Sequence, residues 1–358
     1  MFQYIIKKIG YAFLTLLGVI SVIFLLFNIL PGDPAQMMLG QNETEEQLQA
    51  VRAKYGFDKS LGTQYLYYVN DLSPVSVHSN QTAAYTYLEE DKYQVWASAD
   101  LGSFTLALKT PYLRESFQKN GKKVSVVIAE TLPNTFVLAV SAIVIALSIG
   151  IFFGIISALQ KDSVWDKAIQ VLSTLGMSVP SFFSAILFAW FFGYVLHEYT
   201  NLNMTGSLYE LDDFGEKNTL QLKNLILPAI VLGIRPLAVV IQLMRNALLE
   251  VLQQDYIRTA RAKGLSTKRI ILKHALKNAL NPVVTAISGW FASMLAGAVF
   301  VEYIFGWNGL GKEIVDALNT LDLPVIMGAV LIIALMFIII NIFVDIVYGW
   351  LDPKITRA

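Results

Sequence analysis

Six long runs of apolar residues dominate the pattern of this 358-residue chain. A helix that rises ~1.5 Å per residue crosses a bilayer core of ~30 Å with about 20 apolar residues. Each run has about this length. The pattern therefore predicts an all-α membrane protein with six transmembrane helices, at residues 9–30, 133–159, 169–196, 225–243, 283–301 and 325–350.

The first run could be mistaken for a signal peptide, because Lys7 and Lys8 precede it. Its apolar length exceeds the ~7–15 residues of a signal-peptide core. It also leads into Leu30-Pro31-Gly32-Asp33-Pro34 rather than into a cleavage site of small residues. We therefore predict an uncleaved membrane anchor over residues 1–30.

Basic residues in the short flanking segments indicate the orientation, because short loops rich in Lys and Arg stay in the cytoplasm. With both termini inside, the inner segments carry 14 basic residues and the short outer segments carry three. The inner ones are Lys7, Lys8, Lys161, Lys167, Arg245, Arg258, Arg261, Lys263, Lys268, Arg269, Lys273, Lys277, Lys354 and Arg357. The outer ones are Lys217, Lys223 and Lys312. We therefore predict that both termini are cytoplasmic.

The first loop, residues 31–132, is then outside the membrane and predicts a small extracytoplasmic domain, followed by a five-helix core at 133–358. Apolar and aromatic residues follow a helical spacing between residues 43 and 69, and no clear pattern follows. Glu89-Glu90-Asp91 lacks metal-ligand spacing, which favours a solvated acidic turn over a cation site.

The fourth loop, residues 250–281, is cytoplasmic and basic. Its apolar positions recur at helical spacing, Gly264 interrupts them, and Ser266 is a suitable N-cap for a second helix. The pattern predicts two short amphipathic helices joined at a glycine. Three interpretations of this loop are a surface resting on anionic lipid, a nucleic-acid site, and a docking surface for a soluble partner. Membrane tethering at both ends and the lack of aromatic interleaving argue against nucleic acid.

Composition narrows the function further. Hydrophobic residues make up 55% and charged residues 15% of the chain, against ~25% charged residues in soluble proteins. The net charge is zero, and there is no Cys to form a disulfide, a thiolate zinc site or a nucleophile. The three histidines, His78, His197 and His274, are too scattered for a metal site or a catalytic set.

Two ionisable residues, Arg235 and Asp345, fall within the fourth and sixth runs, where charge is costly. Structural roles are favoured for both over an ion pair or a proton relay. Pro180 predicts a kink in the third run. Gly150 and Gly154 predict close helix packing.

Several segments resemble the permease subunits of ABC importers for dipeptides and oligopeptides. The strongest match is residues 255–265, DYIRTARAKGL, followed by residues 274–282, HALKNALNP. Further matches are Gly32-Asp33-Pro34, Asp100-Leu101-Gly102, Pro180, residues 225–229, Glu302 with Ile304-Phe305, and Asn341, Asp345, Tyr348, Asp352 and Pro353. The segment 73–123 looks longer than the family's usual loop, and the resemblance gives it no role.

The resemblance implies a multi-pass subunit of the bacterial inner membrane that moves peptides by alternating access. It implies a second permease, two cytoplasmic ATPases and an external solute-binding protein as partners, with ATP and Mg held by the ATPases and no cofactor in this chain. The residues it assigns to ATPase coupling are Asp255, Tyr256, Arg258, Thr259, Ala260, Arg261, Ala262, Gly264, Leu265 and His274.

The fifth run carries small residues, including Ser288, Ser293 and Gly297, and is attached directly to the coupling loop. We expect these three to line the substrate path.

Two other functions remain as alternatives, an ion-coupled secondary transporter and an intramembrane enzyme using Asp345 as an acid. The first predicts repeated halves and several intramembrane charges, and the second needs another catalytic group at the same depth. Neither feature is evident. The segment 306–313, GWNGLGKE, only approximates a phosphate loop, because Glu313 occupies the position of the magnesium-binding Ser or Thr.

Overall fold

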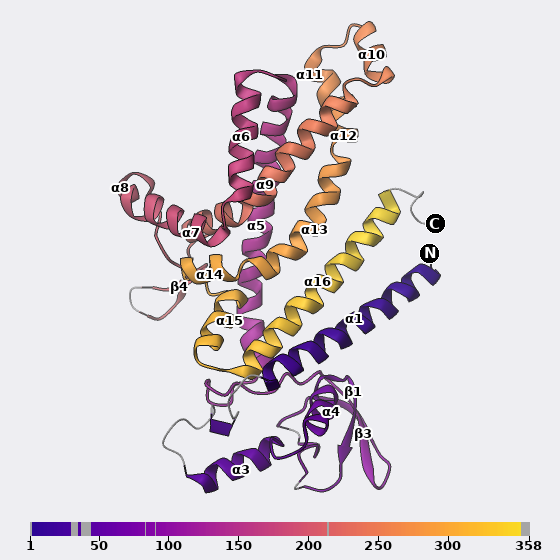
Figure 1. Ribbon diagram of the computed structural model, residues 1–358, viewed down its shortest axis with the longest axis vertical. Helices are drawn as coiled ribbons and strands as arrows, with labels where there is room; N and C mark the ends of the chain where they lie inside the picture. Colours follow the sequence, from indigo (N-terminus) through magenta and orange to yellow (C-terminus); the bar gives the residue numbers. More distant parts are fainter. Residues whose placement is uncertain are drawn as a thin grey trace. The chain divides into compact units, whose positions relative to one another are not determined.

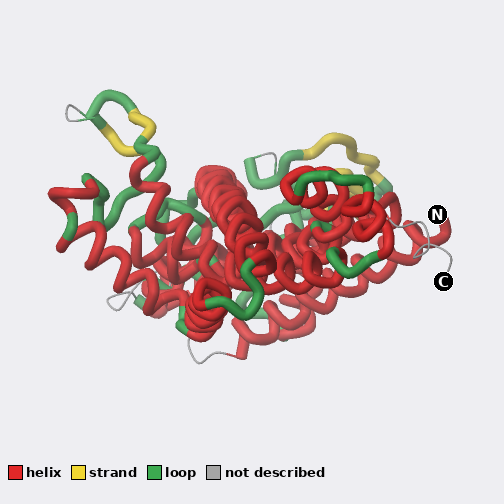
Figure 2. The backbone as a smooth tube through the Cα atoms, turned by 90° about the horizontal axis from the view of Figure 1, so that it is seen from above, coloured by secondary structure: helices red, strands yellow, loops and turns green. Residues whose placement is uncertain are grey.

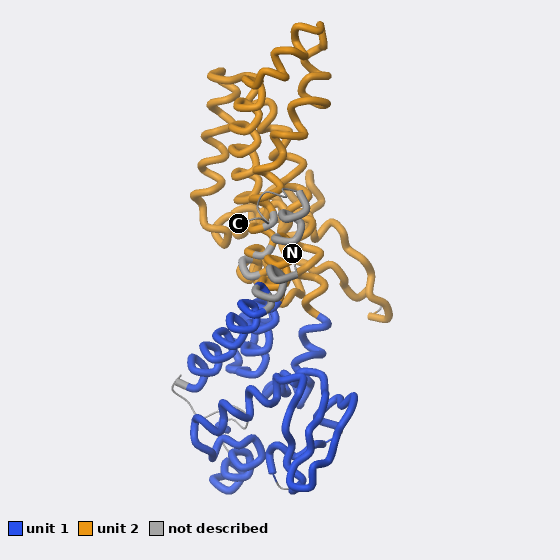
Figure 3. The backbone as a smooth tube through the Cα atoms, turned by 90° about the vertical axis from the view of Figure 1, so that its right-hand side faces the viewer, with its two compact units in different colours: residues 1–130, 313–335 blue, residues 131–312, 336–358 orange. Residues whose placement is uncertain are grey.

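The computed structural model of the chain describes residues 2–29, 35–36, 44–82, 84–89, 91–212 and 215–351. Most of these residues are helical (Figure 2). The chain divides into two compact units, residues 1–130 with 313–335 (unit 1) and residues 131–312 with 336–358 (unit 2) (Figure 3). The predicted family matches at Gly32-Asp33-Pro34, Asp352 and Pro353 lie outside the described residues.

Unit 1 combines helices with a small sheet (Figure 1). Its elements are α1 (Phe2–Ile29), α3 (Glu45–Tyr55), α4 (Leu61–Leu72), β1 (Val75–Ser79), β2 (Val95–Asp100) and β3 (Phe104–Lys109). The helical region predicted over residues 43–69 consists of two helices, because Gly56 takes a left-handed φ of +71° that ends α3. Thr44 begins α3 with a capping box in which it exchanges hydrogen bonds with Gln47.

The sheet of unit 1 was not anticipated from the sequence. Its three strands are antiparallel in the order β1-β3-β2, with Leu106 opposite Val77 on one side and opposite Ala99 on the other. Five of the six residues of β2 are exposed, so the strand lacks the alternation of apolar and polar residues by which a strand is recognised.

Unit 2 holds the remaining helices and a short hairpin. Its elements are α6 (Val164–Ser178), α7 (Ser181–Trp190), η1 (Phe191–Val195), α8 (His197–Thr200), β4 (Tyr209–Leu211), β5 (Asn218–Leu220), α9 (Lys223–Val251), α10 (Asp255–Ala262), α11 (Thr267–Arg269), η2 (Ile270–Ala275), α12 (Leu276–Ala279), α13 (Asn281–Gly297) and α14 (Val299–Phe305). Three helices contribute residues to both units, α5 (Val124–Leu159), α15 (Leu310–Asn319) and α16 (Leu323–Leu351).

Small residues allow α5 and α9 to pack closely, as predicted. A Cβ at Gly150 would lie 2.7 Å from the side chain of Val240, and a Cβ at Gly154 would lie 2.6 Å from that of Met244. Both distances are shorter than van der Waals contact. The two glycines therefore have a packing role.

Four described helices, α1, α5, α9 and α16, are long and apolar enough to cross a membrane. The third and fifth predicted spans are each a pair of helices joined at a bend. Helices α6 and α7 meet at Pro180 with a bend of 108°, and α13 and α14 meet with a bend of 57°. Pro180 lacks an N–H and disfavours helical geometry at Val179, so the chain turns there instead of only kinking.

Candidate functional site

The predicted coupling loop forms a compact element, here named the coupling element, of two helical arms. The first arm is α10, and the second comprises α11, η2 and α12. Gly264 joins them with a left-handed φ of +77°, a conformation that residues with a Cβ adopt only at a cost. Ser266 occupies the predicted N-cap position, although its side chain makes no capping hydrogen bond. The prediction of two short helices joined at a glycine is confirmed.

Apolar residues of both arms fix the coupling element to the membrane helices. Ile257 and Ala260 of the first arm and Ile270, Ala275 and Ala279 of the second arm are buried. They form one cluster with α9, including its Met244 and Leu248, and with the end of α5 at Ala158. Figure 1 shows α12 running beside α9. Both arms therefore share one apolar cluster with α9.

The other face of the coupling element is open to solvent. Most of the residues predicted to couple are exposed, namely Asp255, Tyr256, Arg258, Thr259, Arg261, Ala262 and Gly264. Leu265 and His274 are half-buried, and Ala260 is buried, so it packs inward instead of presenting a contact surface. Arg258 pairs with Asp255 at 3.4 Å, and the Tyr256 hydroxyl accepts a hydrogen bond of 2.8 Å from the Asn278 side chain. The second contact links the two arms.

An ion pair between the buried Asp166 and the half-buried Arg245 joins α6 to α9, and sequence reasoning missed it. Both guanidinium nitrogens Nε and Nη2 of Arg245 donate to the Asp166 carboxylate at 2.8 Å. The Ser157 hydroxyl and the Gln170 amide also donate to it, at 2.5 and 2.9 Å. The sequence shows both charges only as residues flanking apolar runs. Their opposite signs at a similar predicted depth were the available signal.

A small cavity of 90 Å³ forms where α6 and α7 bend apart. Ser293 of α13 and Arg235 of α9 both line it, together with Ser181 and Ser184 of α7. The Arg235 side chain is exposed, and no hydrogen bond or ion pair joins it to another described residue. Among the predicted path residues, Ser293 therefore lines a cavity. The Arg235 side chain, which has no partner among the described residues, lines the same cavity.

The other two predicted path residues lie on the same helix. Ser288 and Gly297 belong to α13, but the surroundings of their side-chain positions lie outside what the structure describes. The same holds for Asp345 on α16. Asp345, the acid in the enzyme alternative, is therefore located on α16, and its neighbours are not described.

The segment resembling a phosphate loop already holds a carboxylate. Glu302 is buried, and its Oε2 accepts hydrogen bonds from the backbone N–H groups of Gly311 and Lys312, at 2.7 and 3.2 Å. Trp307 is also fully buried, and its Nε1 donates to the Asn134 carbonyl at 3.1 Å. The backbone N–H groups at the start of α15, which would bind the phosphate in a phosphate loop, therefore bind the Glu302 carboxylate instead.

Comparison with known proteins agrees with this architecture. The family described as binding-protein-dependent transport system inner membrane component matches residues 150–357, and the N-terminal part of such membrane components matches residues 1–86. The chain is 33% identical to the di/tripeptide transport system permease protein DppB of Pseudomonas aeruginosa over 99% of both chains. It is 32% identical to the dipeptide transport system permease protein DppB of Escherichia coli over 99% of both chains. It is also 32% identical to that of Bacillus subtilis, over 99% of this chain and 98% of the relative.

These matches span both ends of the chain and include the coupling element, the broken helices and the long membrane helices. The chain belongs to the family of inner-membrane components of binding-protein-dependent transport systems.

Proposed function

We propose that this chain is a permease subunit of an ATP-driven ABC importer that moves short peptides into the cell by alternating access. Full-length identity to permeases named for dipeptides and for di- and tripeptides supports the peptide substrate. In this proposal six spans cross the bacterial inner membrane, with α6–α7 and α13–α14 each forming one broken span. Both termini are cytoplasmic, residues 1–30 form an anchor, 31–132 an extracytoplasmic domain and 133–358 the core.

The chain works with four partners in this proposal. A second permease completes the path, an external binding protein delivers peptide, and two cytoplasmic ATPases bind ATP and Mg and supply the energy. The chain itself is a transport component and carries no cofactor. The proposed docking surface for one ATPase is the exposed face of the coupling element, formed by Asp255, Tyr256, Arg258, Thr259, Arg261, Ala262, Gly264, Leu265 and His274.

The observation that supports this role most directly is the two-sided coupling element. Its outer face is polar and free, whereas Ile257, Ala260 and Ile270 on its inner face are buried against α9 and α5. A flexible loop would absorb a partner's movement. Two arms that are packed on membrane helices and joined at Gly264 transmit it as a rigid body.

Replacement of Gly264 tests this role. Gly264→Val places a β-branched residue at φ +77°, where an L-residue costs ~1–2 kcal/mol or more, so the elbow changes shape although there is open space around its Cβ. In proteoliposomes with the complete importer, we expect ATP-dependent peptide uptake to fall by roughly tenfold.

Gly102→Val is the matched control. Gly102 lies in the turn between β2 and β3, also with a left-handed φ, +84°, and also with nothing within 4 Å of a Cβ. Gly102→Val introduces the same backbone strain at a position distant in sequence from the coupling element. It should therefore leave ATPase association unchanged. If Gly264→Val kept both normal uptake and ATPase association, the coupling role would be excluded.

The cavity at the bend of α6 and α7 is the proposed part of the substrate path within this chain. Ser293 and Arg235 line it, and Ser288 and Gly297 lie on the same helix as Ser293. A charged side chain inside a membrane protein faces protein or water. Ser293→Phe should fill this 90 Å³ space and reduce peptide uptake by at least about tenfold while the four partner subunits still co-purify. Normal uptake by this variant would remove Ser293 from the path.

A further inference from the structure

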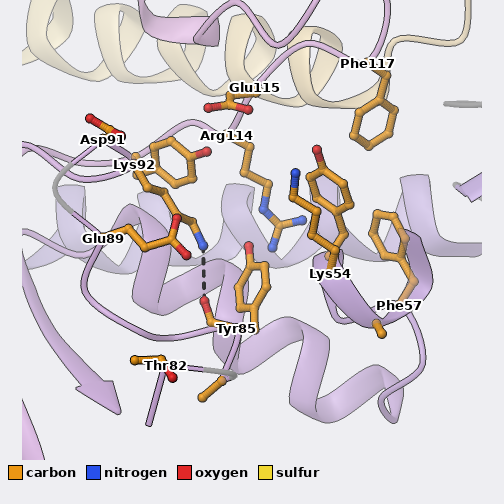
Figure 4. A pocket seen from close by; sticks show the side chains of 14 residues that line it. Lys54, Phe57, Thr82, Tyr85, Glu89, Asp91, Lys92, Arg114, Glu115 and Phe117 are labelled. Atoms are coloured by element: carbon orange, nitrogen blue, oxygen red, sulfur yellow. Dashed lines mark hydrogen bonds between the residues drawn. The ribbon is translucent and has the colours of Figure 1, made fainter. Parts of the chain in front are cut away.

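Unit 1 contains a cavity of 360 Å³ (Figure 4), here named the unit 1 pocket, within the ~300–1,000 Å³ of small-molecule sites. It lies between the end of α3, the segment around Tyr85 to Lys92 and the segment from Tyr112 to Phe117. Neither the family resemblance nor the transport role assigns anything to this pocket.

A buried carboxylate organises one wall of the pocket. Asp71 is 1% exposed and accepts hydrogen bonds from the hydroxyls of Tyr85 and Tyr93, at 2.7 and 2.9 Å. Arg114 donates to it only through Nε, at 3.2 Å. Lys109 is buried beside it and donates to the Asp71 backbone carbonyl at 2.5 Å. The wall is preorganised because each of these groups is fixed by the others.

Lys92 and Arg114 line the pocket, and each retains hydrogen-bond donors that no other described residue accepts. The Arg114 guanidinium lines the pocket, and no hydrogen bond or ion pair joins its terminal nitrogens to another described residue. Its backbone has a φ of +67°, a strained conformation for a residue with a side chain. Lys92 donates to the Tyr85 carbonyl at 3.2 Å and lies 3.9 Å from the centre of the Tyr85 ring. In the view of Figure 4, Tyr85 stands between Lys92 and Arg114.

Lys92 lies close to charges of both signs. Burial lowers the pKa of the Lys92 amine. The carboxylates of Asp71, Glu89 and Glu115 act in the opposite direction, and the charge of Arg114 adds to the lowering. Burial likewise lowers the pKa of Lys109 to about 8. A ligand carboxylate suits the space beside Lys92 and Arg114 because each of these cations offers hydrogen-bond donors.

Negatively charged side chains line the same pocket as these cations. Glu89, Asp91 and Glu115 contribute to it, and within the described part of the chain no ion pair links them to Lys54, Lys92 or Arg114. Two of the three, Glu89 and Asp91, are exposed. The pocket therefore offers positive and negative side chains that are not paired with one another. A ligand that carries both a positive and a negative charge requires such a site.

Aromatic side chains form the remaining wall. The rings of Tyr55 and Phe57 stack with centres 5.9 Å apart, and Phe117 meets Phe57 edge to face at 6.4 Å. All three line the pocket. Such a wall binds an apolar or aromatic side chain of a ligand without specifying it closely.

We propose that the unit 1 pocket binds a short zwitterionic peptide, whose carboxylate lies against Lys92 and Arg114, whose ammonium group lies near Glu89 and Glu115, and whose side chains lie against Phe57 and Phe117. The choice of a peptide over other zwitterions rests on the proposed function. The pocket then gives the permease a substrate site of its own, separate from the binding protein and from the path at Ser293.

Direct binding to the full-length chain tests this site. The purified chain in lipid nanodiscs, with no other subunit, is titrated calorimetrically with the dipeptide Ala-Phe. We expect saturable binding that Lys92→Gln weakens by about tenfold, because one charge-assisted hydrogen bond is lost. Ala-Phe amide, which lacks the carboxylate, should bind wild type about tenfold more weakly and should be insensitive to Lys92→Gln.

Glu115→Gln provides a second, conservative variant. It should weaken Ala-Phe about fivefold and leave N-acetyl-Ala-Phe, which lacks the ammonium group, unchanged. The matched control is Lys59→Gln, because Lys59 lies in the same unit, pairs with Asp58 and does not line the pocket. It should bind Ala-Phe as wild type does.

Absence of saturable binding to wild type, or equal weakening by Lys59→Gln and Lys92→Gln, overturns the site. Uptake by the complete importer is measured separately. Intact ATP-dependent peptide uptake without binding to the isolated chain contradicts this inference alone, whereas a complete importer that takes up no peptide contradicts the proposed function.

Discussion

Each of the two units contains a buried aspartate beside an arginine, but the two pairs use the arginine differently. In unit 2, Asp166 receives both Nε and Nη2 of Arg245, and the arginine side chain is 15% exposed. In unit 1, Asp71 receives only Nε of Arg114, and two tyrosine hydroxyls fill its remaining positions. The Arg114 side chain is 21% exposed and lines a pocket.

The difference separates a structural ion pair from one that leaves donors free. A bidentate pair uses the planar fork of the guanidinium fully and fixes two helices to each other. A pair through Nε alone leaves the terminal nitrogens for another acceptor. The local sequence around each arginine shows neither arrangement, because the partner aspartate is 79 residues away for Arg245 and 43 for Arg114.

The largest effect is expected from breaking the pair in unit 2. Asp166→Ala removes the buried partner of the half-buried Arg245 guanidinium, and removal of one member of a buried ion pair costs ~3–5 kcal/mol. Thermal unfolding of the purified chain in detergent, followed by circular dichroism, should show a strongly lowered midpoint. Glu250→Ala is the control, because Glu250 is an exposed carboxylate on α9 and its loss should change stability by less than ~0.5 kcal/mol. Equal midpoints for the two variants would show that the pair is dispensable.

A pH-dependent effect should appear in unit 1 and should be missing once Lys109 is replaced. Burial lowers the pKa of Lys109 from 10.5 to about 8 in the folded chain. Between these values the unfolded chain holds a proton that the folded chain has released, so folding stability rises with pH by at most ~1.4 kcal/mol per unit. Below about pH 8 both states are protonated and the dependence from Lys109 vanishes.

The comparison for this prediction is wild type against Lys109→Met, which retains the side-chain length without the charge. Their difference in unfolding free energy should shift in favour of wild type by about 1 kcal/mol between pH 8.5 and pH 9.5. Chemical unfolding at pH 7.5, 8.5 and 9.5 measures it. A difference that stays constant over this range would mean that Lys109 keeps its ordinary pKa.

The smallest effects concern helix caps, where the two units again differ. Thr44 of unit 1 makes a capping box with Gln47, and Thr44→Ala should cost about 1 kcal/mol. Ser266 of unit 2 occupies an N-cap position without a capping hydrogen bond, so Ser266→Ala should cost less than ~0.5 kcal/mol. Equilibrium unfolding of the two variants side by side measures the contrast. Equal losses would indicate that Ser266 caps its helix in solution.

The coupling element was the part most accessible to prediction from sequence. Its helical spacing, the break at Gly264 and the buried position of Ile257 all follow from local pattern, because a glycine at a helix end and an apolar stripe each act over a few residues. Ala260 shares the helical spacing of the apolar positions and is buried with them, whereas the family resemblance had placed it among the ATPase contacts.

Unit 1 shows why other features could not be predicted. The pocket joins Lys54, Tyr85 and Arg114 from three separate segments, and the sheet pairs β1 with β3 across about thirty residues. The sequence favoured a solvated acidic turn around Glu89 and Asp91, and the place of these residues beside Lys92 depends on how separate segments fold together. The bend of 108° at Pro180 also exceeds the kink that a proline alone predicts.

The sequence by itself determined that this is a helical membrane protein, where its apolar runs lie, and that it resembles the peptide-importer permeases. These properties depend on hydrophobic length, charge bias and contiguous motifs, which act locally along the chain. Only the tertiary structure decided that Arg245 closes on Asp166 while Arg114 keeps free donors toward a pocket. A buried charge is stabilised by whichever groups surround it in space, and those groups come from segments that the sequence keeps apart.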